Sequence, residues 1–224
     1  MKSSTMLLLI MCFSTLLFSQ KNDLLFTNSQ LIDEDRYKEM DYSPYLFKEW
    51  VHGNITAKSN TEEAIENVLL NYNGYTKSFE VRKDNRFIEL EGSYYSTIAI
   101  PTEDMVFKLG MHPTLQDRFM RIVYEGKSIA IVQDFVVSLQ KREKKLYGKV
   151  NIVSEFIKRP MYYVIRDNKA TVLKLKKKTI MPLLDNNKQV AAYIKKEGLK
   201  MKSEEDLVQV LRVYEKDTRV GQVE

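Results

Sequence analysis

Residues 119–134 carry the clearest pattern of apolar and polar positions in the chain. Two runs rich in β-branched and aromatic side chains flank Glu125-Gly126-Lys127, a sequence typical of a tight turn. This pattern predicts a β-hairpin. Residues 161–175 repeat it with a turn at Asp167-Asn168 and lead into a helical tail. The chain is therefore expected to be a series of antiparallel hairpins closed by helices.

Shorter strand signals precede the first of these hairpins. Phe79 and Val81 alternate with charged residues, which predicts a strand with one buried face and one wet face. Asn73-Gly74 marks a turn before this strand. The predicted strands in this part of the chain are 53–57, 65–72, 78–82, 86–90, 94–100 and 105–109, with a further turn at 83–85.

The pattern weakens between the two hairpins. Residues 135–140 continue the apolar run of the first hairpin, whereas residues 141–145 are all charged and predict a loop or the end of a helix. Residues 152–157 are compatible with either a strand or a connecting segment, because Tyr147-Gly148 and Pro160 punctuate both sides.

In the tail, the apolar positions change from a period of two to a period of about 3.6, which predicts helices. Gly198 suits the left-handed position at the end of one helix, and Ser203 and Asp206 fit a capping box at the start of the next. Pro182 would disturb the first helix unless it lies in its first turn. The predicted helices are 177–184, 187–197 and a segment that starts at Ser203 and carries Leu207, Leu211 and Tyr214 on one stripe.

The amino terminus has the pattern of a secretory signal peptide. Lys2 supplies a positive charge, and residues 6–18 form an apolar run that is shorter than the about 20 residues needed to span a bilayer. Cleavage is expected before Gln20 or Lys21. Cys12 is the only cysteine and would leave with the signal. An exported chain without disulfides must be stabilised by its core.

The residues after the signal differ from those that follow them. Residues 20–44 alternate short apolar pieces with acidic clusters and end at Ser43-Pro44, which indicates an extended, partly ordered lead-in. Residues 45–50 include the only tryptophan, Trp50, and are expected to pack against the sheet as an apolar plug.

Together these patterns predict an α+β fold, an antiparallel, hairpin-rich sheet or partly open barrel followed by about three short C-terminal helices. About 205 mature residues are enough for such a fold with a sizeable core. The predicted division of the chain is a signal peptide at 1–19, an extended lead-in at 20–44, an antiparallel β domain at 45–175, a helical region packed on the sheet at 176–217 and a tail at 218–224.

Charge is distributed unevenly along a chain whose formal net charge is +5. Residues 170–202 contain nine lysines against Asp185 and Glu197. Each lysine beside an anionic membrane surface can contribute on the order of 1 kcal/mol, so this region is a candidate contact with acidic lipid, lipopolysaccharide or a partner protein. The plainer interpretation is a solvated helical face, because lysine is a good helix former and solubiliser. The candidate contact residues are Lys174, Lys176, Lys177, Lys178, Lys195 and Lys196.

No catalytic or metal-binding motif stands out in the sequence. His52 and His112 lack the convergent spacing that metal ligation needs, and structural roles are expected for both. Ser128 lies in a hairpin turn and not in a nucleophile elbow or a P-loop. The acidic pairs 62–63 and 204–205 suit a turn and a helix start without catalysis. The sequence therefore predicts a protein that is not an enzyme and uses no cofactor or metal.

Several segments carry a likeness to a known group of proteins. They are the signal peptide ending in Ser19-Gln20, Tyr45-Leu-Phe-Lys-Glu-Trp50 followed by Gly53, the pair 70–72 and 79–81, residues 119–127, and the tail 175–178 with 193–196. These segments resemble exported proteins of Bacteroidota, of flavobacteria especially, a family without a known function. The resemblance implies a Gram-negative envelope, export through the inner membrane, and a place in the periplasm or at the outer membrane. It implies no activity and no functional residues.

Two functions are compatible with these observations. The first is a non-enzymatic envelope protein, an accessory or structural subunit that docks on an outer-membrane or periplasmic assembly through sheet edges and the lysine-rich tail. The second is a periplasmic binder of a small apolar or lipid ligand within a barrel-like sheet. Nucleic acid is not an expected partner, because the chain is exported and its basic tail lacks interleaved aromatic residues apart from Tyr193.

Overall fold

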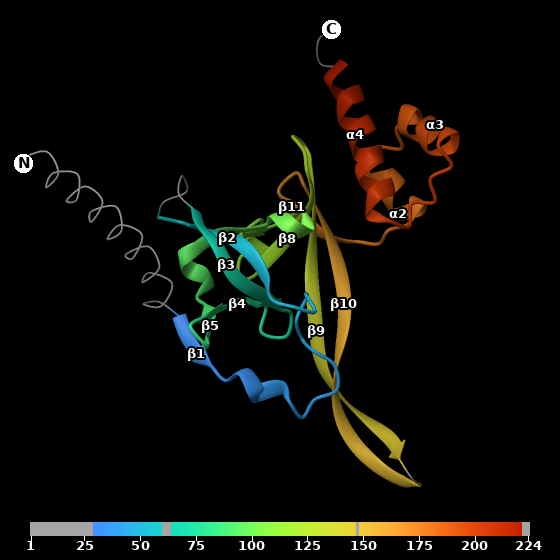
Figure 1. Cartoon of the computed structure of the whole chain (residues 1–224). Helices are drawn as coiled ribbons and strands as arrows, with labels where there is room; N and C mark the ends of the chain where they lie inside the picture. Colours follow the sequence, from blue (N-terminus) through green and yellow to red (C-terminus); the bar gives the residue numbers. More distant parts are fainter. Residues whose placement is uncertain (1–28, 60–63, 147, 221–224) are drawn as a thin grey trace, which may run out of the picture. The chain divides into compact units, whose positions relative to one another are not determined.

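The computed structural model describes residues 29–59, 64–146 and 148–220 (Figure 1). The strands of this part of the chain form one antiparallel sheet of eleven strands that is not closed, in the order β1-β5-β4-β3-β2-β6-β7-β8-β9-β10-β11. Three α-helices follow the sheet, so the predicted α+β fold is confirmed. The predicted signal peptide at 1–19 lies outside the described residues.

The elements agree closely with most of the predicted segments. The strands are β1 (Ser29–Ile32), β2 (Val51–Ala57), β3 (Ala64–Asn73), β4 (Ser78–Lys83), β5 (Arg86–Leu90), β6 (Tyr95–Ile100), β7 (Met105–Leu109), β8 (Phe119–Glu125), β9 (Ile129–Leu146), β10 (Lys149–Arg166) and β11 (Lys169–Leu173), and the helices are α2 (Lys177–Leu183), α3 (Lys188–Lys196) and α4 (Glu204–Val220).

Both predicted hairpins are confirmed. β8 pairs with β9, and β10 pairs with β11 across a turn in which Asp167 and Asn168 have positive φ. Two such residues in succession are typical of a type I′ hairpin turn. The same left-handed pair occurs at Asp84 and Asn85 between β4 and β5. Short Asp and Asn side chains tolerate this conformation, which is why the sequence locates these turns well.

Contacts divide the chain into two compact units, each described here by itself. The first, called the sheet unit, comprises Met1–Leu109, Asp117–Phe119 and Val137–Lys158. The second, called the helical unit, comprises Gly110–Gln116, Met120–Val136 and Arg159–Glu224. The grouping follows spatial contacts, so the long strands β9 and β10 contribute residues to both units.

Large aromatic side chains form the core of the sheet unit. The ring centroid of Phe79 lies 4.9 Å from that of Tyr72 and 5.0 Å from that of Phe107. The ring centroid of Phe119 lies 5.3 Å from that of Phe79. All four residues are almost completely buried. Tilted and edge-on ring pairs of this kind stabilise a core beyond the area that they bury.

Part of the predicted lead-in is a strand. β1 pairs with β5, with Leu31 opposite Ile88, and forms one edge of the sheet. A 3-10 helix, η1 (Glu34–Tyr37), follows, and the Asp33 side chain caps it by accepting a hydrogen bond from the Asp35 N–H at 3.0 Å. The apolar pattern does not reveal β1, because an edge strand is held by its backbone hydrogen bonds and Leu31 is 64 % exposed.

The segment around Trp50 packs on the sheet as predicted. The Trp50 ring centroid lies 5.3 Å from that of Phe87 in β5 and 5.9 Å from that of Tyr45. The Leu46 N–H donates to the carbonyl oxygen of Tyr72 at 2.9 Å. Side-chain and backbone contacts therefore both hold this segment against the sheet unit.

β9 and β10 are longer than the sequence indicates (Figure 1). The prediction of a loop or helix end at 141–145 is wrong, because these residues continue β9. The open assignment at 152–157 resolves to a strand, part of β10. Residues 141–145 are all exposed, so no buried face marks them in the sequence. Backbone hydrogen bonds between two paired strands form without a buried face.

The helical unit has its own apolar core. Leu207, Leu211 and Tyr214, the stripe predicted on the last helix, are buried together with residues of the β8–β9 hairpin, α2 and α3. Pro182 lies inside α2, which ends one residue later. Of the helices that the structure describes, none has the length and apolar character needed to cross a membrane.

The predicted ends of the helices are confirmed except for one half of the capping box, because the Asp206 carboxylate accepts from the Met201 N–H at 2.7 Å in place of the Ser203 N–H. The φ angle of Gly198 is +64°, the left-handed conformation expected just beyond α3. The Ser203 hydroxyl accepts a hydrogen bond from the Asp206 N–H at 3.2 Å at the start of α4. The Asn187 side chain caps α3 in the same way, by accepting from the Val190 N–H at 3.0 Å.

A polar network, called the Glu204 network, joins the start of α4 to the strands of the helical unit. The Glu204 carboxylate accepts hydrogen bonds from the Arg121 guanidinium and, at 2.7 Å, from the Tyr162 hydroxyl. Gln133 completes the network, since its side-chain oxygen accepts from Arg121 at 2.6 Å. Burial and the neighbouring Glu204 carboxylate raise the pKa of Tyr162 to about 12, so its hydroxyl remains a donor at neutral pH.

Glu215 of α4 reaches the turn between β8 and β9. This residue is buried, and its Oε1 atom accepts a hydrogen bond from the Ser128 N–H at 3.4 Å. A Cβ atom added at Gly126 would lie 1.9 Å from the same oxygen. Any larger residue at this turn therefore forces the Glu215 side chain to move.

Gly126→Ala should lower the free energy of unfolding by about 1 kcal/mol, because the new methyl group displaces the Glu215 carboxylate and the Ser128 N–H loses its acceptor. Urea unfolding followed by circular dichroism measures this change. Gly92→Ala is the matched control, since a Cβ atom there would have no neighbour closer than 3.8 Å. An equal loss in both variants would contradict the packing argument.

Candidate functional site

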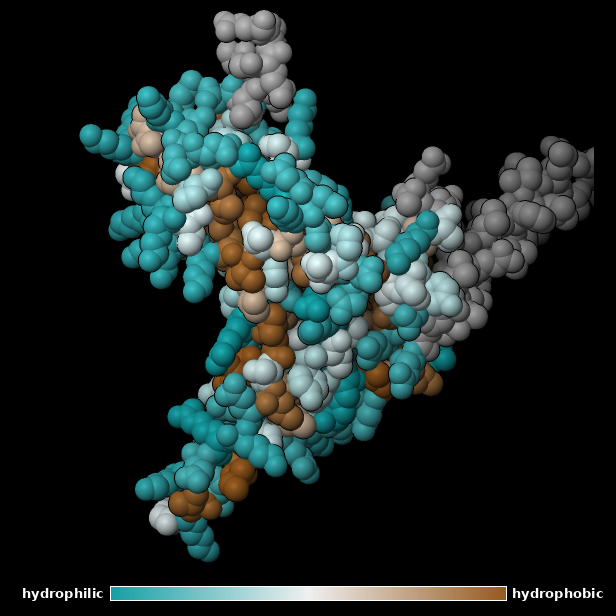
Figure 2. Space-filling model, turned by 180° about the vertical axis from the view of Figure 1, so that it is seen from behind, coloured by the Kyte–Doolittle hydropathy of each residue, from teal (hydrophilic) through white to brown (hydrophobic). Residues whose placement is uncertain are grey.

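The predicted contact lysines are all exposed on the helical unit. Figure 2 shows hydrophilic side chains over much of the helical unit on the face that it displays. The lysines fall at two helix ends, one set around the start of α2 and the other at the end of α3. We call Lys174, Lys176, Lys177 and Lys178 the α2 set, and Lys195 and Lys196 the α3 set.

Helix electrostatics distinguishes the two sets. The end of a helix carries partial negative charge, so Lys195 and Lys196 stabilise α3 where they stand. The start of a helix carries partial positive charge, yet α2 has Lys176 at its N-cap, two more lysines directly after it and no acidic residue in its first turn. Each such lysine is unfavourable by roughly 0.3–1 kcal/mol at low salt. The position of the α3 set stabilises its helix, whereas the position of the α2 set does not.

The α2 set also has no ion-pair partner in the part of the chain that the structure describes. Among the residues that the structure describes, no ion pair involves any of its four lysines, whereas Lys196 of the α3 set lies 3.4 Å from Glu197. The positive charge at the start of α2 is therefore available to a binding partner.

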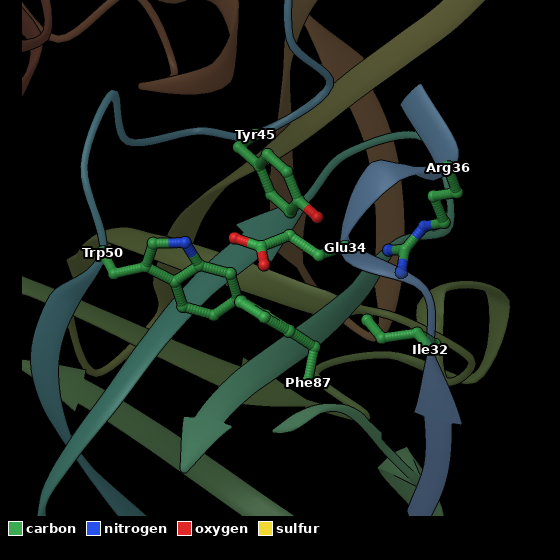
Figure 3. Close-up of a pocket in the computed structure, with 6 residues that line it drawn as sticks. All are labelled: Ile32, Glu34, Arg36, Tyr45, Trp50 and Phe87. Atoms are coloured by element: carbon green, nitrogen blue, oxygen red, sulfur yellow. The ribbon is translucent and has the colours of Figure 1, made fainter. Parts of the chain in front are cut away.

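A small pocket in the sheet unit is the second candidate (Figure 3). Its volume is about 210 Å³. In the close-up, the Glu34 carboxylate points toward the Trp50 side chain, and Phe87 lies beside that indole. The pocket is lined by Ile32, Glu34, Arg36, Tyr45, Trp50 and Phe87.

A buried carboxylate binds two of the polar side chains of this pocket. Glu80 is completely buried, so the wet face predicted for its strand is wrong at this position. Its Oε1 atom accepts hydrogen bonds from the Arg36 guanidinium and, at 2.7 Å, from the Asn73 amide. Its Oε2 atom accepts from the Tyr45 hydroxyl at 2.7 Å. We call Arg36, Tyr45, Asn73 and Glu80 the Glu80 cluster.

The electrostatics of the Glu80 cluster indicates a structural role. Burial raises the pKa of the Glu80 carboxyl, and the hydrogen bonds from Tyr45, Asn73 and Arg36 oppose that rise. Burial and the Glu80 carboxylate raise the pKa of Tyr45 far above that of a free phenol, so Tyr45 remains a donor. The polar groups of the cluster bind one another, and the pocket beside it is smaller than the roughly 300–1,000 Å³ typical of ligand sites. Neither the cluster nor the pocket therefore indicates a ligand site.

The two histidines contact different kinds of element, His52 a residue of β3 and His112 a 3-10 helix and the β10–β11 turn. His52 Nδ1 lies 3.4 Å from the carbonyl oxygen of Asn67. His112 Nδ1 lies 2.9 Å from the Thr114 hydroxyl, and its Nε2 atom lies 3.0 Å from the carbonyl oxygen of Asn168. Within the described residues, no hydrogen bond or ion pair joins a histidine to a carboxylate or to Ser128, and no cluster of three potential ligands forms a metal site.

Comparison with known proteins assigns no family to this geometry. The chain matches no known protein-family model, no curated protein and no solved structure. The resemblance to exported proteins of Bacteroidota therefore stays a prediction. The exposed lysines and the edge strands are the features that bear on function.

Sequence reasoning missed both the Glu80 cluster, whose carboxylate is buried, and the Glu204 network, whose carboxylate is partly buried. Glu80 alternates with apolar residues as a solvent-facing strand residue does, and its partners come from separate segments of the chain. Glu204 stands in a capping sequence, where an acidic residue needs no further explanation. No local signal in the sequence marks Glu80 as buried or Glu204 as the centre of a polar network.

Proposed function

We propose that the protein is a non-enzymatic accessory or structural subunit of the cell envelope that docks on an outer-membrane or periplasmic assembly. The observation that carries this proposal is the α2 set. Its exposed lysines stand where helix electrostatics disfavours them, and no ion pair within the described residues compensates them. Such a position is expected where a partner supplies the negative charge. The predicted export signal and the resemblance to envelope proteins support the location.

The two edge strands support the same proposal. β1 and β11 end the strand order of the sheet. Each carries an exposed aliphatic residue, Leu31 at 64 % and Val172 at 58 %. The outer side of an edge strand presents unpaired N–H and C=O groups, to which a strand of another protein can add.

The second hypothesis, a binder of a small apolar or lipid ligand inside a barrel-like sheet, has no comparable support. The sheet is not closed. Tyr72, Phe79 and Phe107 fill the core of the sheet unit and leave less than 2 % of each side chain exposed. We therefore retain only the docking function.

Replacing Lys176, Lys177 and Lys178 by glutamate should weaken association with the envelope without unfolding the protein. Glutamate at the start of α2 complements the partial positive charge of the helix, so the free energy of unfolding should stay constant or rise by about 1 kcal/mol. Affinity purification of the tagged chain from detergent-solubilised envelopes, followed by mass spectrometry, should recover the partner with the wild type and lose it with the variant.

The matched control for this experiment reverses the charge of the α3 set. Lys195→Glu with Lys196→Glu places negative charge at the end of α3, which should lower stability slightly. Recovery of the partner should be unaffected. Unchanged recovery with the α2 variant would contradict the proposed docking surface.

A further inference from the structure

The turn end of the β9–β10 ribbon is exposed on both of its faces. Residues 141–145 and 149–152, called the ribbon tip, are all exposed. Figure 1 shows the two strands continuing as a pair beyond the other strands of the sheet unit. A two-stranded ribbon without a covered face is at best marginally stable in water. An additional contact is therefore expected at the ribbon tip.

The ribbon tip presents aliphatic side chains to solvent. Val150 is 54 % exposed and Ile152 is 72 % exposed. Alternate residues of a strand point to the same face, so these two side chains lie side by side on one face of the ribbon. Figure 2 shows hydrophobic residues between hydrophilic ones at this end of the ribbon.

Basic side chains lie along both strands of the ribbon tip. Arg142 lies 3.8 Å from Glu155, and Lys144 lies 3.2 Å from Asp41, so carboxylates of the sheet unit partly neutralise both. The other charged residues of the ribbon tip are three lysines and one glutamate. They are Lys141, Lys145, Lys149 and Glu143.

The Arg142–Glu155 pair also fixes which side chains share a face. Residues 142 and 155 point to the same side of the ribbon. By alternation, the odd-numbered residues of the β9 end therefore share the opposite face with Val150 and Ile152. The aliphatic pair lies on a face that carries Lys141, Glu143 and Lys145, whereas Lys149 lies on the face of Arg142.

We propose that the ribbon tip binds the surface of an anionic phospholipid bilayer. Val150 and Ile152 enter the boundary between headgroups and acyl chains, and Lys141 and Lys145, which share their face, contact the lipid phosphates. Lysine suits this place because its aliphatic stem lies along apolar surface while its ammonium group stays among the headgroups. This inference does not rest on the α2 set, which belongs to the other compact unit.

Two physical arguments favour a bilayer over a protein partner. A specific protein interface buries about 800 Å² on each side, and the narrow end of one ribbon presents little area to a rigid surface. A fluid bilayer adapts to a contact of any shape. No third strand among the described elements pairs with the ribbon tip. The hydrocarbon core of a bilayer would leave the outer N–H and C=O groups of the tip unsatisfied. The tip is therefore expected to enter the bilayer only as far as the headgroups and the boundary of the acyl chains.

A fluorescent label at the ribbon tip tests the proposal. The full chain with Cys12→Ser and Ile152→Cys is labelled with nitrobenzoxadiazole, whose emission rises in an apolar environment. Vesicles of phosphatidylglycerol mixed with phosphatidylcholine should increase this emission severalfold and shift it to the blue, and vesicles of phosphatidylcholine alone should not. A label at one position reports the tip itself, so vesicle binding by another part of the chain does not produce the signal.

Leu31→Cys, in the same Cys12→Ser background, is the matched control. Leu31 is 64 % exposed, as a tip residue is, but acidic Asp33, Glu34 and Asp35 follow it. Its label should not respond to anionic vesicles.

Charge reversal at the tip provides a second test. Lys141→Glu with Lys145→Glu in the chain labelled at position 152 should raise the lipid concentration at half-maximal signal by at least about tenfold, because each lysine near an anionic surface contributes about fivefold. Unchanged emission of Trp50, which packs on Phe87 in the sheet unit, verifies that the variant is folded.

The proposal is overturned if the label at 152 does not respond to phosphatidylglycerol, responds equally to phosphatidylcholine, or keeps its midpoint after charge reversal. An equal response at position 31 overturns it as well. These outcomes are independent of the envelope experiment with the α2 set, so failure of one proposal leaves the other intact.

Discussion

Glu80→Ala should lower the free energy of unfolding by about 3–5 kcal/mol, the loss expected when one partner of a buried ion pair is removed. The Arg36 side chain is only 20 % exposed and would lose its counter-charge. Tyr45 and Asn73 would each lose an acceptor in a space that water enters poorly. Urea unfolding followed by circular dichroism measures the change.

Glu89→Gln is the matched control for Glu80. Glu89 stands directly opposite Glu80 on β5, and like charges in a cross-strand pair are destabilising. Its neutralisation should leave the free energy of unfolding unchanged or raise it by up to about 0.5 kcal/mol. If both variants lost the same stability, the effect at Glu80 would not come from the partners that bind it.

Glu204→Ala should lower the free energy of unfolding by about 2–4 kcal/mol, because a single carboxylate serves several partly buried donors. The Arg121 side chain is 15 % exposed and would lose its ion pair, and the Tyr162 hydroxyl would lose its acceptor. The loss should be concentrated in the helical unit. Hydrogen exchange should accelerate at the start of α4 and along β8, and it should change little in β3 and β4.

Glu205→Ala separates this network from helix capping. Glu205 is the next residue in the chain, shares the favourable position in the first turn of α4 and is exposed to solvent. Its removal should therefore change stability far less than the removal of Glu204. Similar losses in the two variants would assign the effect to the helix start and not to the network.

The elements that the sequence predicts correctly are those whose cause is local. The turn at Asp167-Asn168 needs two residues that tolerate positive φ, and the end of α3 needs Gly198. The start of α4 needs a side chain such as Ser203 within reach of an N–H three residues later. In each case the residues that determine the structure lie within a few positions of one another, so the pattern is complete in the sequence.

The features that the sequence does not predict depend on partners that are distant along the chain. Glu80 is buried because Arg36, Tyr45 and Asn73 approach it from other segments. The charged residues 141–145 form a strand because another strand lies beside them. Hydrophobic periodicity detects burial against a core, and neither carboxylate clusters nor exposed ribbons leave that signal.

The strand order also has a consequence for the order of folding. Along the sheet that the structure describes, every neighbouring pair is consecutive in the chain except β1–β5 and β2–β6. Hairpins of consecutive strands close short loops, so they can form one after another while the chain is synthesised from its amino terminus. β1 cannot pair until β5 has emerged, since Ser29 lies opposite Leu90. The earliest described strand therefore docks later than the strands between it and β5, and Glu80 stays hydrated until η1 brings Arg36 to it.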